Sequence, residues 1–408
     1  MSPYRHGHNS TSVVVTGLGV VSPYGRGAQV YWQGLSQPQC AIRAISLFPT
    51  EGFRSRIGAE VCSESLGAFR RASRSRANRF IVTAAEEAVH NAVLRLEDLG
   101  NAAVSIGGAG GGMLEAEAWY WSHYGKRENR RLRGGLRTML PTTQTEAVAS
   151  RFRIGGPRET PILACSSSAA AIATIVDLIE TGVVDVGLAG GVDTLTRLCF
   201  MGFNALKLLD PQPCRPFAHD RRGMSLGEGA AVLVLEARHR AEARGVPVRA
   251  CVVGCGMASD AFHPTAPPAD AEGAVRAMRE ALARACLTPS DIVYVNAHGT
   301  GTVQNDRAEA TAMEQVFGAG RVLVSSTKSL IGHTMGAAGA MEAVATILAM
   351  EAGVLPPTAN LAELDSAIPF DCIPNVPRSL VCNSAMSNSF GFGGQNVSLI
   401  FCRPGICG

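Results

Sequence analysis

The stretch "PILACSSSAAAIATIVDLIETG", Pro161 to Gly182, places one cysteine before three serines and an almost unbroken apolar run. The run leaves too few polar positions for a solvent-facing side, so it predicts a helix that is buried on all sides. We expect a serine to cap its start and Gly182 to close its end in a left-handed conformation. Cys165 then lies at the N-terminal end of the helix.

Two interpretations of this cysteine remain open from the stretch alone. Unpaired backbone N–H groups and the positive pole of the helix would lower the pKa of the Cys165 thiol and make it a nucleophile. A structural core cysteine is an equal alternative, because free cysteine is among the most buried residue types. Other segments of the chain must decide.

The composition excludes several classes of protein. The chain has 408 residues, of which 46% are hydrophobic and 17% charged, and 45 glycines, which suits a large α/β protein. The net charge is only +3, and the arginine-rich "RRASRSRANR" has no interleaved aromatic residues, so nucleic acid is not expected as a partner. The 12 cysteines are scattered, and the close pair Cys251 and Cys255 lacks the further ligands of a zinc site. We expect reduced thiols and no bound metal.

The sequence predicts a cytoplasmic protein. Its start, "MSPYRHGHNSTS", is polar and lacks the apolar segment of a signal peptide. Elsewhere no stretch of about 18 or more apolar residues is free of charge. We therefore expect a protein that is neither exported nor membrane-spanning.

Similar strings at two places indicate two related halves. "SVVVTGLGVVSPYG" near the N-terminus reads as a buried strand that runs into a glycine turn, and "VRACVVGCGMASD" repeats the pattern from Val248. Apolar strand runs alternate with helical segments such as 271–286 and 335–352, which predicts buried sheets covered by helices. We place the halves at 1–245 and 246–408, joined by the charged stretch 236–247.

Two histidines and a lysine of the second half are candidate functional residues. In "VYVNAHGTGT" His298 follows the end of a buried strand, where ligand crevices of α/β sheets lie. In "SSTKSLIGHTMGAAGAMEA" Lys328 and His333 are five residues apart, and His333 enters an apolar helix rich in small residues. Each of these residues could be structural, and the glycine runs lack the spacing of a phosphate-binding fingerprint. Their combination with Cys165 is the stronger signal.

Together, "ACSSS", "NAHGTGT", "STKSLIGHTMGAAGAMEA" and "NSFGFGGQN", in this order and spacing, resemble the elongating β-ketoacyl-[acyl-carrier-protein] synthases. The resemblance extends over essentially the whole chain, from "VVVTGLGVVSPYG" to "SLIF", and includes "CRPFAHDRRGMSLGEGAAVLVLE". It implies a duplicated five-layer αβαβα fold of the thiolase type. It also implies dimerisation through the central sheet, either with a second copy or with a related subunit.

The resemblance also implies a reaction and the residues that carry it. Cys165 would accept the acyl group of an acyl carrier protein as a thioester, without any cofactor of the enzyme's own. His298 and His333 would hold the malonyl thioester carbonyl while CO₂ leaves, and Lys328 would order the two histidines. The backbone N–H groups of Cys165 and Phe392 would form the oxyanion hole, with the glycines around Phe392 letting that loop move as a gate.

Further positions match family residues of lesser importance. Asp306 and Glu309 would support the site. The expected substrate-binding residues are Thr300, Thr302, Phe390, Phe203 and Gly110, with Gly110 at the bottom of the acyl pocket. An alternative for Gly107 to Gly112 is a tight turn that needs positive φ. The candidate docking residues for a carrier protein are Arg70, Arg71, Arg74, Arg76, Arg79 and Arg215. A solvated helix face is the alternative for this cluster.

The chain departs from the commonest family pattern at three places. Gln395 stands where threonine is frequent, Asn305 stands where a small residue is usual, and Cys165 is followed by three serines. These departures favour the specialised synthases of type II polyketide or polyene pathways over the fatty-acid enzyme. The alternatives are a non-catalytic chain-length partner, which usually lacks the cysteine, and a condensing enzyme that uses coenzyme A thioesters, in which one histidine is replaced.

Overall fold

The structure is a computed structural model that describes residues 12–62, 75–125 and 133–406. The elements of the first half are β1 (Val13–Ser22), β2 (Gly25–Arg26), α1 (Ala28–Ser36), β3 (Arg43–Ala44), β4 (Ile57–Ala59), α2 (Arg76–Asn91), β5 (Ala103–Gly107), α3 (Met113–Tyr124), α4 (Arg133–Thr138), α5 (Thr142–Phe152), β6 (Arg158–Glu159), α6 (Ser167–Glu180), β7 (Val186–Asp193), α7 (Arg197–Ala205), β8 (Leu226–Gly227), β9 (Gly229–Ala237) and α8 (Arg238–Arg244).

The second half repeats much of this order. Its elements are β10 (Ala250–Ser259), α9 (Glu272–Ala285), β11 (Tyr294–Asn296), α10 (Val303–Phe317), β12 (Leu323–Ser325), α11 (Lys328–Ile331), α12 (Ala338–Ala352), β13 (Val354–Leu355), β14 (Asp371–Cys372), β15 (Arg378–Ser379), β16 (Ser384–Gly391) and β17 (Gln395–Cys402).

The strand order shows the duplication directly. In the first half the order is β6-β5-β7-β9-β1, and in the second it is β12-β11-β16-β17-β10, with β14 added at the outer edge. In both halves the first three of these strands are parallel and the last two join antiparallel. The two halves meet where β1 pairs with β10 over three residues on each strand.

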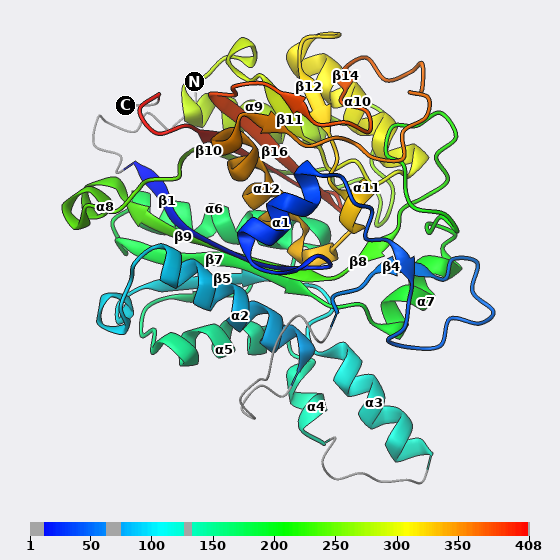
Figure 1. Cartoon of the computed structure of the whole chain (residues 1–408), viewed down its shortest axis with the longest axis horizontal. Coiled ribbons are helices and arrows are strands. Elements are labelled where there is room, and N and C mark those ends of the chain that lie inside the picture. Colours follow the sequence, from blue (N-terminus) through cyan, green and yellow to red (C-terminus); the bar gives the residue numbers. More distant parts are fainter. Residues whose placement is uncertain (1–11, 63–74, 126–132, 407–408) are drawn as a thin grey trace.

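The elements stack in five layers, as Figure 1 shows. Helices α2 and α5 cover the outer face of the first sheet, and α9 and α10 cover the outer face of the second. Helices α6 and α12 lie between the sheets and pack against each other. The predicted five-layer αβαβα arrangement is therefore confirmed, and the N-terminal ends of α6 and α12 meet at its centre.

Equivalent glycines in β1 and β10 explain why each strand holds its own outer helix so closely. A Cβ atom on Gly17 would lie 2.0 Å from the backbone oxygen of Ala88 in α2, and one on Gly254 would lie 2.2 Å from that of Ala281 in α9. The strand pairing shifts at Gly17 and at Gly254, so each glycine also sits at a β-bulge. Only glycine allows the strand to approach the helix this closely at either position. This shared steric requirement is the physical basis of the repeated sequence pattern.

The buried helix predicted after Cys165 is α6, and Gly182 after it has φ 70°, as expected of a left-handed closing residue. The start differs from the prediction. Ser166 is the N-cap residue, but its side chain accepts no hydrogen bond from the first turn. Its hydroxyl donates elsewhere instead, as described below.

The predicted helical segments 271–286 and 335–352 are α9 and a 3₁₀ turn (Met335–Ala337) followed by α12. The segment Met335–Ala352 is long and apolar enough to cross a membrane, but 89% of it is buried inside the protein. This degree of burial is typical of a core helix.

Candidate active site

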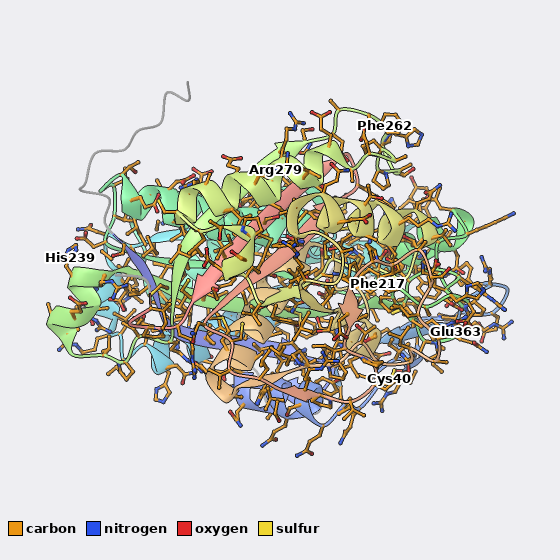
Figure 2. The ribbon with its side chains drawn as sticks, turned by 90° about the horizontal axis from the view of Figure 1, so that it is seen from above. Cys40, Phe217, His239, Phe262, Arg279 and Glu363 are labelled. Carbon is orange, nitrogen blue, oxygen red and sulfur yellow. The ribbon has the colours of Figure 1, made fainter. Side chains whose placement is uncertain are left out.

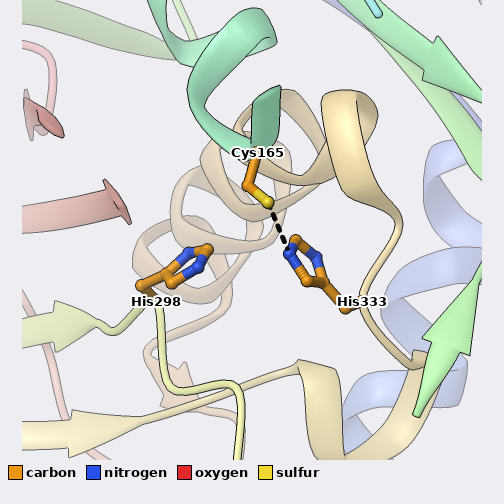
Figure 3. Close-up of side chains that lie close together, drawn as sticks. All are labelled: Cys165, His298 and His333. Atoms are coloured by element: carbon orange, nitrogen blue, oxygen red, sulfur yellow. Dashed lines mark hydrogen bonds between the residues drawn. The ribbon is translucent and has the colours of Figure 1, made fainter. Parts of the chain in front are cut away.

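The candidate nucleophile and the two candidate histidines come together at the centre of the molecule. The Sγ atom of Cys165 lies 3.0 Å from Nε2 of His333, and the rings of His298 and His333 have centroids 5.3 Å apart and nearly perpendicular planes. Figure 3 shows both imidazoles facing the thiol. The cysteine comes from the first half of the chain and both histidines from the second.

Backbone turns with unusual dihedral angles place these side chains. Cys165 lies in a 3₁₀ turn (Ala164–Ser166) before α6, and Ala164 has φ 48°. The equivalent turn before α12 begins with Met335 at φ 50°, and Gly332 before His333 has φ 68°. Non-glycine residues at positive φ are uncommon, so these two turns are held in a conformation that the surrounding packing imposes.

Hydrogen bonds fix the proton positions on both imidazoles. The backbone N–H of Met335 lies 3.3 Å from Nδ1 of His333 and donates to it. The Nζ atom of Lys328 lies 3.3 Å from Nδ1 of His298 and 2.6 Å from the His298 carbonyl oxygen. Because each Nδ1 accepts a hydrogen bond, each neutral ring carries its proton on Nε2. Both histidines therefore act as Nε2–H donors in the site.

The local electrostatics favour the uncharged forms of Cys165, His298 and His333. Burial and the nearby Lys328 ammonium hold the pKa values of His298 and His333 well below their usual range. Burial raises the pKa of the Cys165 thiol to about 11, while Lys328 and a hydrogen bond from the backbone of Phe392 act in the opposite direction. The expected lowering of this pKa is therefore wrong, because the loss of hydration on burial is the largest of these contributions.

Glu342 is a site residue that the sequence analysis missed. Its carboxylate pairs with the Lys328 ammonium, and both side chains are almost fully buried. Burial raises the pKa of Glu342 to about 7, while Lys328 opposes this shift. A signal was present in the sequence, because Glu342 is the one carboxylate within the otherwise apolar stretch Ala338–Met350, and a buried carboxylate needs a cation.

Asp306 and Glu309 hold the turn that carries His298. Glu309 accepts hydrogen bonds from the backbone N–H groups of His298, at 2.8 Å, and Gly299, at 2.7 Å. Asp306 accepts from the backbone N–H groups of Gly301, at 3.1 Å, and Phe217, at 2.8 Å. Phe217, labelled in Figure 2, is fully buried. Both carboxylates are thus placed to support the turn.

A pocket leads from the surface to the thiol. It is lined by Cys165, both histidines and a loop that includes Asp260 and His263. Phe262 in the same loop points to solvent with 66% of its surface exposed (Figure 2). The pocket lining also contains the predicted substrate-binding residues Thr300, Thr302, Phe390 and Phe203, together with Phe392 and Asn305.

Contacts within the pocket show how the polar and aromatic groups are arranged. The hydroxyl oxygens of Thr300 and Thr302 lie 2.9 Å apart. The rings of Phe203 and Phe392 have centroids 5.9 Å apart, so Phe203 packs beside Phe392. Asn305 donates from Nδ2 to Asp306 at 3.2 Å and thereby joins the support of the His298 turn.

Gly110 lies away from these lining residues. Its backbone N–H donates to Oδ1 of Asp193 at 2.6 Å, and a Cβ atom on Gly110 would lie 3.2 Å from the same oxygen. Gly111, with φ 46°, is the one glycine from 107 to 112 that has positive φ. Asp193 also accepts the N–H of Gly336 at 2.6 Å, so it ties this turn to the start of α12. The sequence analysis missed Asp193, which ends the buried strand β7.

Two of the predicted docking arginines are not available to a partner. Arg76 is only 8% exposed and forms a buried ion pair with Glu228. Arg215 is 6% exposed, and its guanidinium contacts Asp220 at 2.9 Å and Asp210 at 3.3 Å. The docking prediction is wrong for both, because their charges are satisfied inside the protein.

Four arginines of the predicted docking cluster remain, of which the structure describes one. Arg79 is half-buried on α2. Arg70, Arg71 and Arg74 lie outside the described residues. A docking role for these four arginines stays a prediction.

The sulfur and imidazole nitrogen atoms of Cys165, His298 and His333 all lie within 4.8 Å of one another. One thiolate and two imidazoles form a donor set that zinc prefers. The positive charge of the Lys328 ammonium beside these residues would repel a bound metal ion. The geometry therefore fits chemistry on a thioester better than metal binding.

Comparison with known families assigns the chain. Residues 10–241 match the family described as "Beta-ketoacyl synthase, N-terminal domain", and residues 249–362 match "Beta-ketoacyl synthase, C-terminal domain". The protein belongs to the β-ketoacyl synthase family. It is therefore a condensing enzyme of the acyltransferase type.

Individual members of the family resemble the chain over nearly its whole length. "Nodulation protein E" of Rhizobium sp. (strain N33) is 37% identical, over 95% of this chain and 98% of the relative. "3-oxoacyl-[acyl-carrier-protein] synthase 2" of Synechocystis sp. (strain ATCC 27184 / PCC 6803 / Kazusa) is 36% identical, over 95% and 97%. The solved structure "The ishigamide ketosynthase/chain length factor" superposes with a TM-score of 0.93 at 34% identity, over 97% of this chain and all of that chain.

Proposed function

We propose that the protein catalyses the decarboxylative Claisen condensation of malonyl-[acyl-carrier-protein] with an acyl group held on Cys165. The observation that carries this proposal is the convergence of a thiol and two Nε2–H donors at the end of one pocket. This arrangement matches the needs of a thioester intermediate and an enolate, and a reaction of this class extends acyl chains in type II fatty-acid or polyketide synthesis.

In the first step Cys165 takes the acyl group. The sulfur adds to the carbonyl carbon of the acyl thioester, and the negative oxygen that forms is held by the backbone N–H groups of Cys165 and Phe392. The carbon–sulfur bond to the carrier arm then breaks, and the departing sulfur takes up the proton that Cys165 loses. Burial raises the pKa of Cys165 to about 11, so little thiolate is present in the resting site at neutral pH, and the oxyanion hole stabilises the transition state of the transfer.

In the second step the malonyl group loses CO₂. The Nε2–H groups of His298 and His333 donate to the thioester carbonyl, and the electron pair of the breaking bond to the carboxylate passes into an enolate. The enolate carbon then attacks the Cys165 thioester, a carbon–carbon bond forms, and the Cys165 sulfur leaves as a thiolate that takes up a proton from water. Neutral imidazoles suit this role, since they donate hydrogen bonds without giving up a proton to the enolate.

The partners follow from the same chemistry. We expect the substrates to arrive on the phosphopantetheine arm of an acyl carrier protein, for which the hydroxyls of Thr300 and Thr302 offer hydrogen bonds in the pocket. The similarity to a ketosynthase with a chain length factor supports pairing with a related subunit, and a pair of identical chains is the alternative. We expect the enzyme to work in the cytoplasm without a metal or other cofactor.

Intact mass tests this proposal. The protein is incubated with acyl carrier proteins that bear acyl groups of different length and saturation, and a gain equal to the acyl group is expected on Cys165. Cys165→Ala should acquire no adduct and form no condensation product, while malonyl decarboxylation persists. Full condensation by Cys165→Ala would contradict the proposal. The chain length of the adducts also identifies the accepted substrates.

A further inference from the structure

Ser166, the residue after the nucleophile, connects two of the departures from the family pattern. Its side chain is fully buried, and its hydroxyl lies 2.8 Å from the carbonyl oxygen of Leu163 and 3.0 Å from that of Gln395. A serine hydroxyl has one proton, so these two acceptors share it. The contact with Gln395 joins the nucleophile turn to a strand that lies 229 residues further along the chain.

The Gln395 end of this contact lies at the base of the hairpin turn that carries Phe392. Gly391 and Gln395 form the last pair of the β16–β17 hairpin, so Phe392 and the two glycines that follow make up its turn. Gly393 and Gly394 both have positive φ, at 82° and 74°. Such a turn has little rigidity of its own, because glycine adopts many conformations. Its geometry depends on how the two strand ends are held.

Both strand ends rest on the nucleophile turn. On the β16 side, a Cβ atom on Gly391 would lie 2.8 Å from the carbonyl oxygen of Leu163 and 2.9 Å from Oγ of Ser166. On the β17 side, the Ser166 hydroxyl binds the Gln395 carbonyl. The Gln395 side chain adds two weaker contacts, from Nε2 to Ser259 Oγ and to the carbonyl of Gly393 in the hairpin turn, both at 3.4 Å.

We propose that Ser166 is a positioning residue that holds the backbone N–H of Phe392 over the Cys165 sulfur and so completes the oxyanion hole. Phe392 lies between the two anchored ends of the hairpin and lines the same pocket as Cys165, and its backbone acts to lower the pKa of the Cys165 thiol. The Ser166 hydroxyl therefore acts through Gln395 and Phe392 and need not contact the substrate. The inference rests on the proposed function, since it concerns the acyl-transfer step of the same site.

Two reactions of the same thiol separate this role from a general structural one. Acyl transfer from a small thioester, such as hexanoyl-N-acetylcysteamine, needs an oxyanion hole, whereas alkylation by iodoacetamide passes through no oxyanion. In Ser166→Ala we expect acyl transfer to Cys165 to slow by about ten- to a hundredfold, since a displaced oxyanion donor costs this order of rate. Alkylation should stay within about twofold of the wild type.

Thr174→Ala is a matched control on the same helix. The Thr174 hydroxyl donates only within α6, to the Ala170 carbonyl at 2.9 Å, so neither reaction should change. Amide hydrogen exchange of the segment 390–396 gives a readout that does not depend on activity, and we expect it to be faster in Ser166→Ala.

Equal losses of acyl transfer and alkylation, or failure of Ser166→Ala to fold, would assign Ser166 to stability and overturn the inference. Unchanged acyl transfer would also overturn it, whatever the exchange shows, and so would slower acyl transfer without faster exchange of 390–396. If the wild-type protein accepts no acyl group from any thioester while iodoacetamide still alkylates Cys165, the proposed function fails instead.

Discussion

The Nε2 atom of His333 lies 3.0 Å from the Sγ atom of Cys165, although 168 positions separate the two residues in the chain. The contact joins the N-terminal ends of α6 and α12, the two central helices. Since one comes from each half of the duplicated fold, the site exists only where both halves meet. The following expectations depend on this arrangement.

The two histidines should be dispensable for acylation and essential for condensation. In His298→Ala or His333→Ala the acyl adduct on Cys165 should remain detectable, while product formation falls by about 10²–10³-fold, as is typical when an oxyanion donor is lost. Intact mass and a product assay on the same samples check this. Loss of the adduct in both variants would show that the histidines serve acyl transfer as well.

Cys165 should titrate as a protonated thiol. Burial raises its pKa to about 11, so the thiolate fraction grows as the pH rises toward that value. The rate of alkylation by iodoacetamide should therefore rise about tenfold per pH unit from about pH 7 to pH 10. A plateau that begins near neutral pH would contradict this, because it would show a thiolate already stabilised in the resting enzyme.

Removing Lys328 should have separable effects on stability and on activity. Lys328→Met leaves the buried Glu342 carboxylate without a cation, which should lower the free energy of unfolding by about 3–5 kcal/mol in a urea titration. Adding Glu342→Leu should restore much of this stability, because an apolar pair can replace a buried ion pair. Condensation should stay low in the double variant, since His298 still lacks its Nδ1 donor. Recovery of both properties would show that Lys328 is only structural.

The ion pair of Arg76 should contribute to folding rather than to docking. Arg76→Ala leaves Glu228 buried and unpaired, so the free energy of unfolding should fall by about 3–5 kcal/mol. Arg151→Ala is the control, because Arg151 and Glu86 form an exposed pair at 2.7 Å, and its loss should cost about 0–1 kcal/mol. Similar stability of the two variants, with a raised KM for carrier-bound substrate only in Arg76→Ala, would restore the docking role.

Gly110 should influence chain length at a cost in stability. The family resemblance puts Gly110 at the bottom of the acyl pocket, although Gly110 is not among the residues that line the pocket around Cys165. On that prediction Gly110→Ile should shorten the longest acyl chain loaded onto Cys165, because the isoleucine side chain would replace buried methylenes of the acyl chain, each worth about 0.8 kcal/mol. The same change presses against Asp193, whose Oδ1 would lie 3.2 Å from the new Cβ, so the melting temperature should fall. An unaltered length profile in the folded variant would show that Gly110 is not the pocket floor.

The sequence was informative where local chemistry decides the structure. The buried helix after Cys165, its closure at Gly182 and the strand before His298 follow from patterns within a few residues. Arg76 was misread because its partner, Glu228, is 152 positions away, and nothing near Arg76 marks it as buried. The pKa of Cys165 was misjudged for a similar reason, since the helix terminus is visible in the sequence and the depth of burial is not.

Pairs formed across the two halves were the hardest to predict. Asp193 ends a strand of the first half, yet it binds the N–H of Gly336 in the second, 143 positions away. Ser166 meets the Gln395 carbonyl by the same kind of contact. These bonds depend on how the two halves of the fold are placed against each other, and no local pattern of residues encodes that placement.

The matching turns before α6 and α12 have different roles. Both start with a residue at positive φ, Ala164 in one and Met335 in the other, and both lead into a central helix. The first presents Cys165, whereas the second offers the N–H of Gly336 to Asp193. One turn thus carries the reactive group, and the other binds the strand end that supports it. A fragment of either half alone would carry only part of the chemistry, and two such fragments would be active only when reassembled.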